Sequence, residues 1–371
     1  MQDARETDYI FTEHMSVGYG KEPLIKDIEL HVKKGEIVTL IGPNGSGKST
    51  ILKSVIRQLN LMGGAVWLDG CPMGEMTEKE TAKKMSILMT DRFLPELMTC
   101  EDVVAAGRYP YTGRLGILRE VDRKKVIEAL ALVHGTEIAD RDFSQISDGQ
   151  RQRILLARAV CQEPEAIVLD EPTSFLDVRH KLELLTILKE LVNQKKVAVL
   201  MSLHELDLAQ KISDYVVCVN GSRIEKTGTP EEIFTSDYIK ELYGISKGSY
   251  QAELGCLEME PVRGKAQVFV IGGNGKGIPV YRRLWRLGIP FAAGVLHKND
   301  MECLAARALA AEVVLEKPFE TIREETFEHA KVLASQCRQV ICCLEEEDFG
   351  EINEKNRELA QLFSGKAEKM F

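Results

Sequence analysis

A glycine-rich segment followed by a lysine and two hydroxyl residues carries the chemistry to bind a triphosphate. It lies between the apolar run 37–41 and a stretch with helical spacing, 49–59, so its N–H groups are expected at a helix N-terminus, where the helix dipole attracts anions. The lysine would place a charge on the β and γ phosphates of ATP, and the serine hydroxyl would bind Mg²⁺. A turn that binds nothing has no use for this lysine and serine. The predicted loop comprises Gly42, Pro43, Asn44, Gly45, Ser46, Gly47, Lys48, Ser49 and Thr50.

Two adjacent carboxylates, Asp170 and Glu171, end another apolar run that begins at residue 166. In a parallel sheet the carboxyl ends of the strands share one edge, so Asp170 is expected beside the phosphate loop, where it would orient the Mg²⁺ shell through water. Glu171 would then activate the attacking water as a general base. Such a pair taken alone is more often a solvated loop, but the phosphate loop upstream favours ATP hydrolysis.

The segment 146–153, Ile-Ser-Asp-Gly-Gln-Arg-Gln-Arg, resembles the signature motif Leu-Ser-Gly-Gly-Gln of ABC ATPases. In that family two cassettes pair head to tail, so the resemblance implies a homodimer in which Ser147, Gly149 and Gln150 of one copy close on the γ-phosphate held by the other. Ser147 and the helix N-terminus would form an anion-binding site, and such a site is useful only if another subunit brings a phosphate to it. The segment is also an ordinary N-capped helix start, which does not exclude that role. Asp148 replaces a family glycine, and its side chain is expected to point away from the nucleotide.

Further positions extend the resemblance over about residues 9–245. Tyr19 is similar to the aromatic residue that stacks on adenine, Asp177 ends a segment similar to the D-loop that crosses the dimer interface, and His204 is similar to the switch histidine that contacts the γ-phosphate. Alone, a tyrosine or histidine at such a place more often has no such role. The family glutamine that reaches Mg²⁺ is absent after the strand pattern 85–89, so Thr90, or the aspartate after it, is expected to hold a Mg²⁺-bound water instead.

Three segments, 107–110, 202–209 and 228–233, are similar to cassettes that energise uptake of iron-siderophores, haem and cobalamin. The resemblance implies a cytoplasmic subunit, peripheral on the inner face of the cell membrane, that docks on two transmembrane permease subunits supplied by an extracytoplasmic substrate-binding protein. The substrate itself would not touch this subunit, so these segments mark the family alone. Two other functions stay open. One is the ATPase subunit of an ABC exporter, and the other is a soluble ABC ATPase whose C-terminal domain senses a small ligand.

Composition narrows the class of protein further. The net charge of −9 argues against a general nucleic-acid binder, because a phosphate backbone rewards clustered positive charge. The nine cysteines are odd in number and form no Cys-x-x-Cys pair, which fits a reducing compartment better than a disulfide framework. No apolar run approaches the roughly 20 residues that span a bilayer, so any membrane role is expected to come through a partner.

The alternation of strand-like and helix-like runs predicts an α/β fold. Together with the resemblance it implies a P-loop NTPase ABC cassette over residues 1–250, with a helical subdomain inserted at about 91–160. A linker is expected over 251–264, followed by a smaller Rossmann-like α/β domain over 265–371.

The predicted second domain has its own glycine-rich turn, 272–277, after a strand pattern. The glycine spacing and the lack of an acidic residue after the strand pattern 291–296 disfavour a dinucleotide. Another anionic ligand and a structural or dimerising role both stay open. The turn also resembles a C-terminal extension of some cobalamin-type import ATPases, which implies a sensing role as a further alternative.

Overall fold

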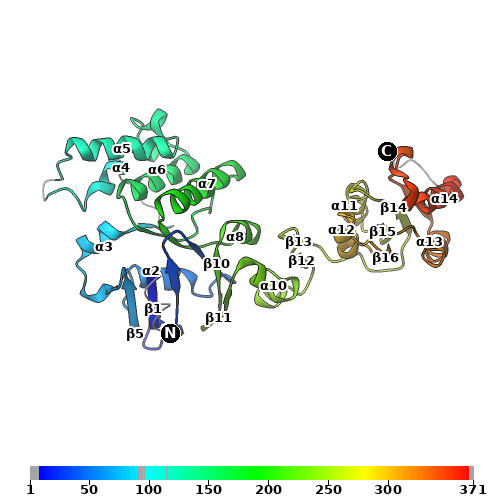
Figure 1. The fold of residues 1–371 in the computed structure, drawn as a ribbon, viewed down its shortest axis with the longest axis horizontal. Coiled ribbons are helices and arrows are strands. Elements are labelled where there is room, and N and C mark those ends of the chain that lie inside the picture. Colours follow the sequence, from blue (N-terminus) through cyan, green and yellow to red (C-terminus); the bar gives the residue numbers. More distant parts are fainter. Residues whose placement is uncertain (1–7, 90–94, 96, 114–115, 367–371) are drawn as a thin grey trace. The chain divides into compact units, whose positions relative to one another are not determined.

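The computed structural model describes residues 8–89, 95, 97–113 and 116–366. They form two compact units, and the chain passes from the first to the second between Tyr243 and Gly244 (Figure 1). Helices and strands alternate in both units, as the sequence predicts for an α/β fold. Among the residues described, no helix combines the length and the apolar character needed to cross a bilayer.

The first unit contains a mostly parallel sheet with fully buried central strands. Its strands are β4 (Ile37–Ile41), β7 (Met85–Leu88), β8 (Ala166–Leu169), β9 (Ala198–Ser202), β10 (Tyr215–Asn220) and β11 (Arg223–Gly228). They lie in the order β11-β10-β4-β9-β8-β7, and all neighbours are parallel except β10 and β11. The strands β4, β8 and β9 are fully buried and apolar except at Thr39 and Ser202, because both of their faces are covered. The carboxyl ends of these three strands therefore lie together at one edge of the sheet.

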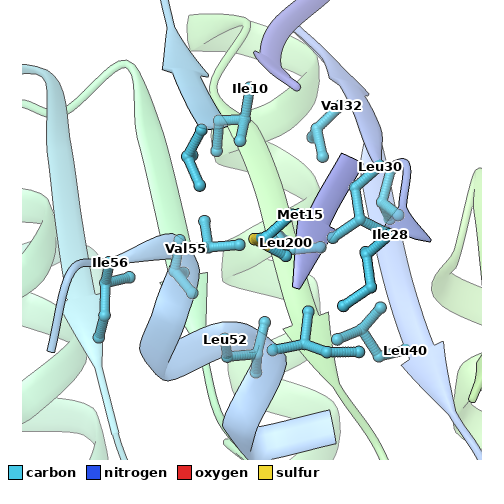
Figure 2. Close-up of a cluster of buried hydrophobic side chains, with 14 of the residues drawn as sticks. Ile10, Met15, Ile28, Leu30, Val32, Leu40, Leu52, Val55, Ile56 and Leu200 are labelled. Carbon is cyan, nitrogen blue, oxygen red and sulfur yellow. The ribbon is translucent and has the colours of Figure 1, made fainter. Parts of the chain in front are cut away.

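A second, antiparallel sheet shares a core with the first. Its strands are β1 (Asp8–Val17), β2 (Ile25–Ile28), β3 (His31–Lys33), β5 (Gly63–Leu68) and β6 (Cys71–Pro72). Figure 2 shows Met15 of β1 and Leu200 of β9 close to Leu52 and Val55 of helix α2 (Lys48–Val55). Because residues of α2 and of both sheets belong to one buried cluster, the start of α2 is fixed next to the end of β4.

Three α-helices of the first unit, α4, α5 and α6, pack against one another. Besides α2, the described α-helices of this unit are α3 (Glu78–Lys84), α4 (Cys100–Ala105), α5 (Glu120–Leu132), α6 (Asp148–Cys161), α7 (Val178–Lys195), α8 (Leu206–Ile212), α9 (Pro230–Ile233) and α10 (Ser236–Leu242). Helices α4, α5 and α6 contact one another, in the region where the sequence predicts a helical subdomain. Figure 1 shows α4, α5 and α6 grouped together, away from the strands of the antiparallel sheet.

Arg108, a buried arginine in the segment between α4 and α5, links helix α5 to helix α6. The Arg108 guanidinium donates to Asp122 Oδ1 at 3.1 Å, to Glu163 Oε2 at 2.9 Å and to the carbonyl oxygen of Cys161 at 2.8 Å. Although burial raises it, hydrogen bonds from Arg119 and Arg108 hold the pKa of the Asp122 carboxyl below its usual value. Arg108 thereby joins the start of α5 to the end of α6.

We expect Arg108→Ala to lower the free energy of unfolding of the first unit by about 3 kcal/mol, because it removes a partner of the fully buried Asp122 carboxylate. Urea denaturation followed by Trp67 fluorescence, with Trp285 replaced by Phe, measures it. Arg119→Ala is the matched control, since Arg119 pairs with the same carboxylate but is 65% exposed. Its loss is expected to stay below about 1 kcal/mol. Equal losses for the two variants would contradict the prediction.

The second unit has a parallel sheet covered on both faces. Its elements are β14 (Val268–Ile271), α11 (Ile278–Arg286), β15 (Phe291–His297), α12 (Glu302–Leu309), β16 (Glu312–Glu316), α13 (Glu324–Gln336), β17 (Gln339–Cys342) and α14 (Glu354–Leu362). The strand order is β16-β15-β14-β17. Successive residues of β14 face opposite sides: Val268 shares a cluster with Tyr281 of α11, and Phe269 shares another with Phe327 of α13.

A short antiparallel hairpin precedes this sheet and belongs to the second unit. It consists of β12 (Ser249–Gln251) and β13 (Cys256–Glu258). The sequence predicts a linker over 251–264, and β13 and the last residue of β12 lie within that range. Tyr250 is buried, and Trp285 Nε1 of α11 donates to the carbonyl oxygen of Glu260 at 2.9 Å. These contacts hold the hairpin and the residues after it on the second unit.

Candidate nucleotide-binding site

A pocket of about 540 Å³ lies beside the carboxyl ends of β4, β8 and β9. Except for Leu24, each residue lining it is one that the sequence predicts for nucleotide binding or hydrolysis. Tyr19 follows β1 and is exposed, so its ring is accessible from the pocket. The lining residues are Tyr19, Leu24, Asn44, Gly45, Gly47, Lys48, Ser49, Thr50, Glu171 and His204.

The Lys48 ammonium group is held over the phosphate loop by backbone carbonyl groups. Its Nζ atom donates to the carbonyl oxygen of Gly42 at 2.8 Å and to that of Pro43 at 3.1 Å. Burial lowers the pKa of Lys48, against the raising effect of the Glu171 and Asp170 charges. Within the part of the chain that the structure describes, Lys48 has no ion-pair partner, so this cation lies at the pocket where an anionic ligand would meet it.

Tyr243, the last residue of the first unit, forms a hydrogen bond with the first residue of the phosphate loop. The Gly42 N–H donates to the Tyr243 hydroxyl oxygen at 3.0 Å. Burial raises the pKa of Tyr243 to about 12. Gly42 and Ser46 are buried and Pro43 is partly buried, and these three residues are not among those that line the pocket, whereas the other residues of the loop are.

A hydrogen-bond chain joins the phosphate loop to the carboxylate pair. Asp170 Oδ1 accepts from Ser49 Oγ at 3.0 Å and from Ser202 Oγ at 2.7 Å, and Ser202 Oγ accepts from the Glu171 N–H at 2.9 Å. Ser202 ends β9, which lies between β4 and β8. The sequence alone predicts no role for Ser202 in the site, although a hydroxyl residue at the end of an apolar strand is a signal that could have identified it.

Glu171 is held in an unusual backbone conformation with both carboxylate oxygens engaged. Its φ of 47° lies in the left-handed region that non-glycine residues rarely adopt, a form of strain that clusters at functional sites. His204 Nε2 contacts Glu171 Oε1, and Ser174 Oγ donates to Glu171 Oε2 at 3.1 Å. The carboxylate is therefore oriented within the pocket, as a general base requires.

The signature segment does not join this pocket: Ser147, Gly149, Gln150 and Asp177 are not among the described residues that line it. Ser147 caps α6, because Ser147 Oγ accepts from the Gln150 N–H at 3.3 Å and Gln150 Oε1 accepts from the Ser147 N–H at 3.1 Å. Asp148 is 70% exposed and pairs with Arg151 at 2.6 Å.

Asp177 and Thr90 are the remaining residues that the sequence predicts for this site. Asp177 caps α7, since its Oδ1 accepts from the His180 N–H at 2.9 Å. Thr90 lies outside the described residues, so its predicted contact with a Mg²⁺-bound water stays a prediction.

In the glycine-rich turn of the second unit, backbone N–H groups donate to a buried carboxylate of the same unit. The fully buried Glu302 at the start of α12 accepts through Oε2 from the Gly273 and Gly277 N–H groups, both at 2.9 Å. The Tyr281 hydroxyl contacts Glu302 Oε1. Burial, then the Glu302 charge, raise the pKa of Tyr281 well above its usual value. The amides that would face a phosphate in a dinucleotide site are thus already bonded to a carboxylate, which favours the structural interpretation of this turn.

We expect Glu302→Ala to lower the free energy of unfolding of the second unit by about 3 kcal/mol, because it leaves buried donors without an acceptor. Trp285 fluorescence in urea, with Trp67 replaced by Phe, measures it. Glu302→Gln keeps an acceptor oxygen and is expected to lose less. The unaltered chain is expected to show no thermal shift of this unit with NAD or pyrophosphate. A clear shift, abolished by Lys276→Ala in this turn, would contradict closure by Glu302.

The chain matches family models over parts of both units and has several curated relatives. A family model described as ABC transporter covers residues 25–174, and one described as the MJ0874 family covers residues 291–371. The ABC transporter ATP-binding protein MJ0873 of Methanocaldococcus jannaschii is 40% identical over 74% of this chain and 94% of its own length. The iron(3+)-hydroxamate import ATP-binding protein FhuC of Bacillus subtilis is 38% identical over 63% of this chain and 87% of its own length. The cobalamin import ATP-binding protein BtuD of Halobacterium salinarum is 29% identical over 82% and 77%.

Solved structures share the fold of the first unit. The dimeric structure of MJ0796, a bacterial ABC transporter cassette, is 25% identical with a TM-score of 0.53 and covers 60% of this chain and 98% of that one. The ATP-binding subunit of another ABC transporter is 25% identical with a TM-score of 0.55, covering 61% and 91%. These matches confirm the predicted cassette fold. With a phosphate loop, a paired carboxylate and a signature segment in place, the chain belongs to the ATP-binding proteins of ABC transporters.

Proposed function

We propose that the chain hydrolyses ATP and thereby powers an importer for iron-siderophore, haem or cobalamin-type substrates. The observation that carries the hydrolytic part is the orientation of Glu171 by His204 and Ser174 in the pocket that Lys48 and Ser49 also line. The relatives named for iron(3+)-hydroxamate and cobalamin import support the importer part.

ATP would bind with its adenine against Tyr19 and its phosphates on the loop amides and Lys48, whose ammonium would exchange carbonyl partners for phosphate oxygens. Ser49 Oγ and Asp170 Oδ1 lie 3.0 Å apart, so two hard oxygen ligands of the kind that Mg²⁺ prefers stand together. Mg²⁺ would be held by Ser49 and, through water, by Asp170 and Thr90, and it neutralises phosphate charge when bound.

In this proposal Glu171 accepts a proton from the attacking water, and His204 keeps the carboxylate in place. The charge on the γ-phosphate is stabilised by the Lys48 ammonium and the loop amides, which are fixed before the reaction starts.

The site is proposed to be completed by a second copy. Ser147, Gly149, Gln150 and Asp177 lie at helix N-termini that line no part of the pocket within one chain. In a head-to-tail homodimer these termini would meet the phosphates bound by the partner copy. The dimeric structure of MJ0796 supports this assembly.

Docking on a permease is proposed at a second cavity of about 700 Å³. The cavity lies between α3 and β7 on one side and the segment after α4 together with α6 on the other, and the exposed Tyr109 stands at it. A cytoplasmic segment of each permease subunit would fill it, which places this chain on the inner face of the cell membrane. A substrate-binding protein outside would contact the permease and not this chain.

Reconstitution tests the direction of transport. The chain and the permease that co-purifies with it from membranes are placed in proteoliposomes with the binding protein on the side opposite this chain. Ferric siderophore, haem or cobalamin is supplied on that side in one set of samples and on the side of this chain in another. Movement of substrate toward the side that carries this chain supports the proposal. Movement away from it favours an exporter, and ATP hydrolysis without any membrane partner favours a soluble ATPase.

A further inference from the structure

A histidine in the first turn of α7 contacts residues of two separate motifs. His180 Nδ1 lies 2.9 Å from Asp177 Oδ1, the same oxygen that accepts from the His180 backbone N–H at 2.9 Å. Since an ionised carboxylate only accepts hydrogen bonds, this contact is favourable when the ring nitrogen carries a proton. The imidazole therefore holds the Asp177 side chain in one orientation.

The same ring covers Gly149 of the signature segment. A Cβ atom at Gly149 would lie 2.8 Å from His180 Nδ1 and 3.0 Å from His180 Cγ, so the ring packs directly on the glycine Cα and leaves no room for a side chain. The ring thus covers Gly149, whereas the Asp148 side chain next to it is 70% exposed.

We propose that His180 is a positioning residue that couples the signature segment to Asp177, so that both reach the partner copy's nucleotide in one fixed arrangement. The inference rests on the proposed head-to-tail dimer. His180 itself would not contact ATP. Its imidazole is partly exposed and contacts motif residues predicted for the dimer interface, which distinguishes it from a residue that fills the core.

The test compares three replacements of His180 in the full chain with its permease. His180→Ala removes the donor and the covering ring, and it is expected to lower kcat about tenfold while leaving the KM for ATP within about twofold. His180→Asn places an amide donor near Asp177 and is expected to restore most of the loss. His180→Leu covers Gly149 without a donor and is expected to restore little. Arg179→Ala, at the exposed neighbouring residue, is the matched control and is expected to behave as the parent.

Dimerisation provides the second readout. In a Glu171→Gln background, light scattering measures the ATP concentration needed for dimer formation, and His180→Ala is expected to raise it about tenfold. Gly149→Ala is expected to impair dimerisation more in the parent than in His180→Ala, because removing the ring makes room for the methyl group. The proposal would be overturned if the effects of Gly149→Ala and His180→Ala on dimerisation simply add. It would also be overturned if His180→Asn and His180→Leu restore kcat equally and only as far as they restore thermal stability. A parent chain that neither hydrolyses ATP nor dimerises would instead refute the proposed function.

Discussion

Glu171→Gln is expected to lower the rate of ATP hydrolysis about a thousandfold while ATP binding is retained. The amide has the size of the carboxylate and still offers an oxygen to Ser174 Oγ, but it does not accept a proton from water, and general-base catalysis contributes about 10²- to 10⁴-fold. Phosphate release measures the rate, and size-exclusion chromatography with light scattering detects the ATP-bound dimer that is expected to accumulate.

Glu205→Gln is the matched control for this variant. Glu205 is close in sequence to His204 but bonds to Lys181 at 2.6 Å and Thr173 at 2.9 Å and does not line the pocket. Its replacement is expected to change the hydrolysis rate less than about threefold. If Glu171→Gln hydrolyses ATP as fast as this control, Glu171 is not the general base.

Lys48→Ala is expected to weaken ATP binding and to lower the rate of hydrolysis together, the opposite pattern to a variant that traps ATP. Losing a charged hydrogen-bond donor weakens ATP binding by about 10- to 100-fold. Losing its charge in the transition state removes about another 100-fold, so kcat/KM is expected to fall about 10³- to 10⁴-fold. Isothermal titration calorimetry with ATP and steady-state kinetics separate the two contributions.

Lys53→Ala, in the same helix but outside the pocket, controls for a general loss of positive charge from α2. It is expected to bind ATP as the parent does. A Lys48→Ala variant with undiminished affinity would show that the ammonium stays on the Gly42 and Pro43 carbonyl groups when ATP is present, and that the loop amides alone hold the phosphates.

The elements that carry local signals were predictable. Nearly continuous apolar runs placed β4 and β8 within a residue, because a strand covered on both faces is apolar at almost every position. The phosphate loop and the carboxylate pair follow these strands directly, so finding the strands also located Lys48 and Glu171. The hairpin at 249–258 was missed because each of its strands is 3 residues long, too short for any periodicity to emerge.

The contacts that position the site were less accessible from the sequence. Ser202 joins Asp170 to the Glu171 backbone across 32 and 31 positions of sequence, and Glu302 reaches back 29 positions to Gly273. Such pairs depend on which strands become neighbours, and spacing along the chain does not encode that. The role of His180 has the same origin, since α6 and α7 meet only in the folded unit.

The hydrogen bond between Gly42 and Tyr243 has a practical consequence for dissecting the chain. A truncated cassette that stops before residue 243 loses the acceptor for an amide at the base of the nucleotide loop, so its weakened ATP binding would wrongly be ascribed to the missing second unit. The boundary between the two units is therefore a sensitive place to cut, and a fragment meant to report on the ATPase alone has to retain that tyrosine.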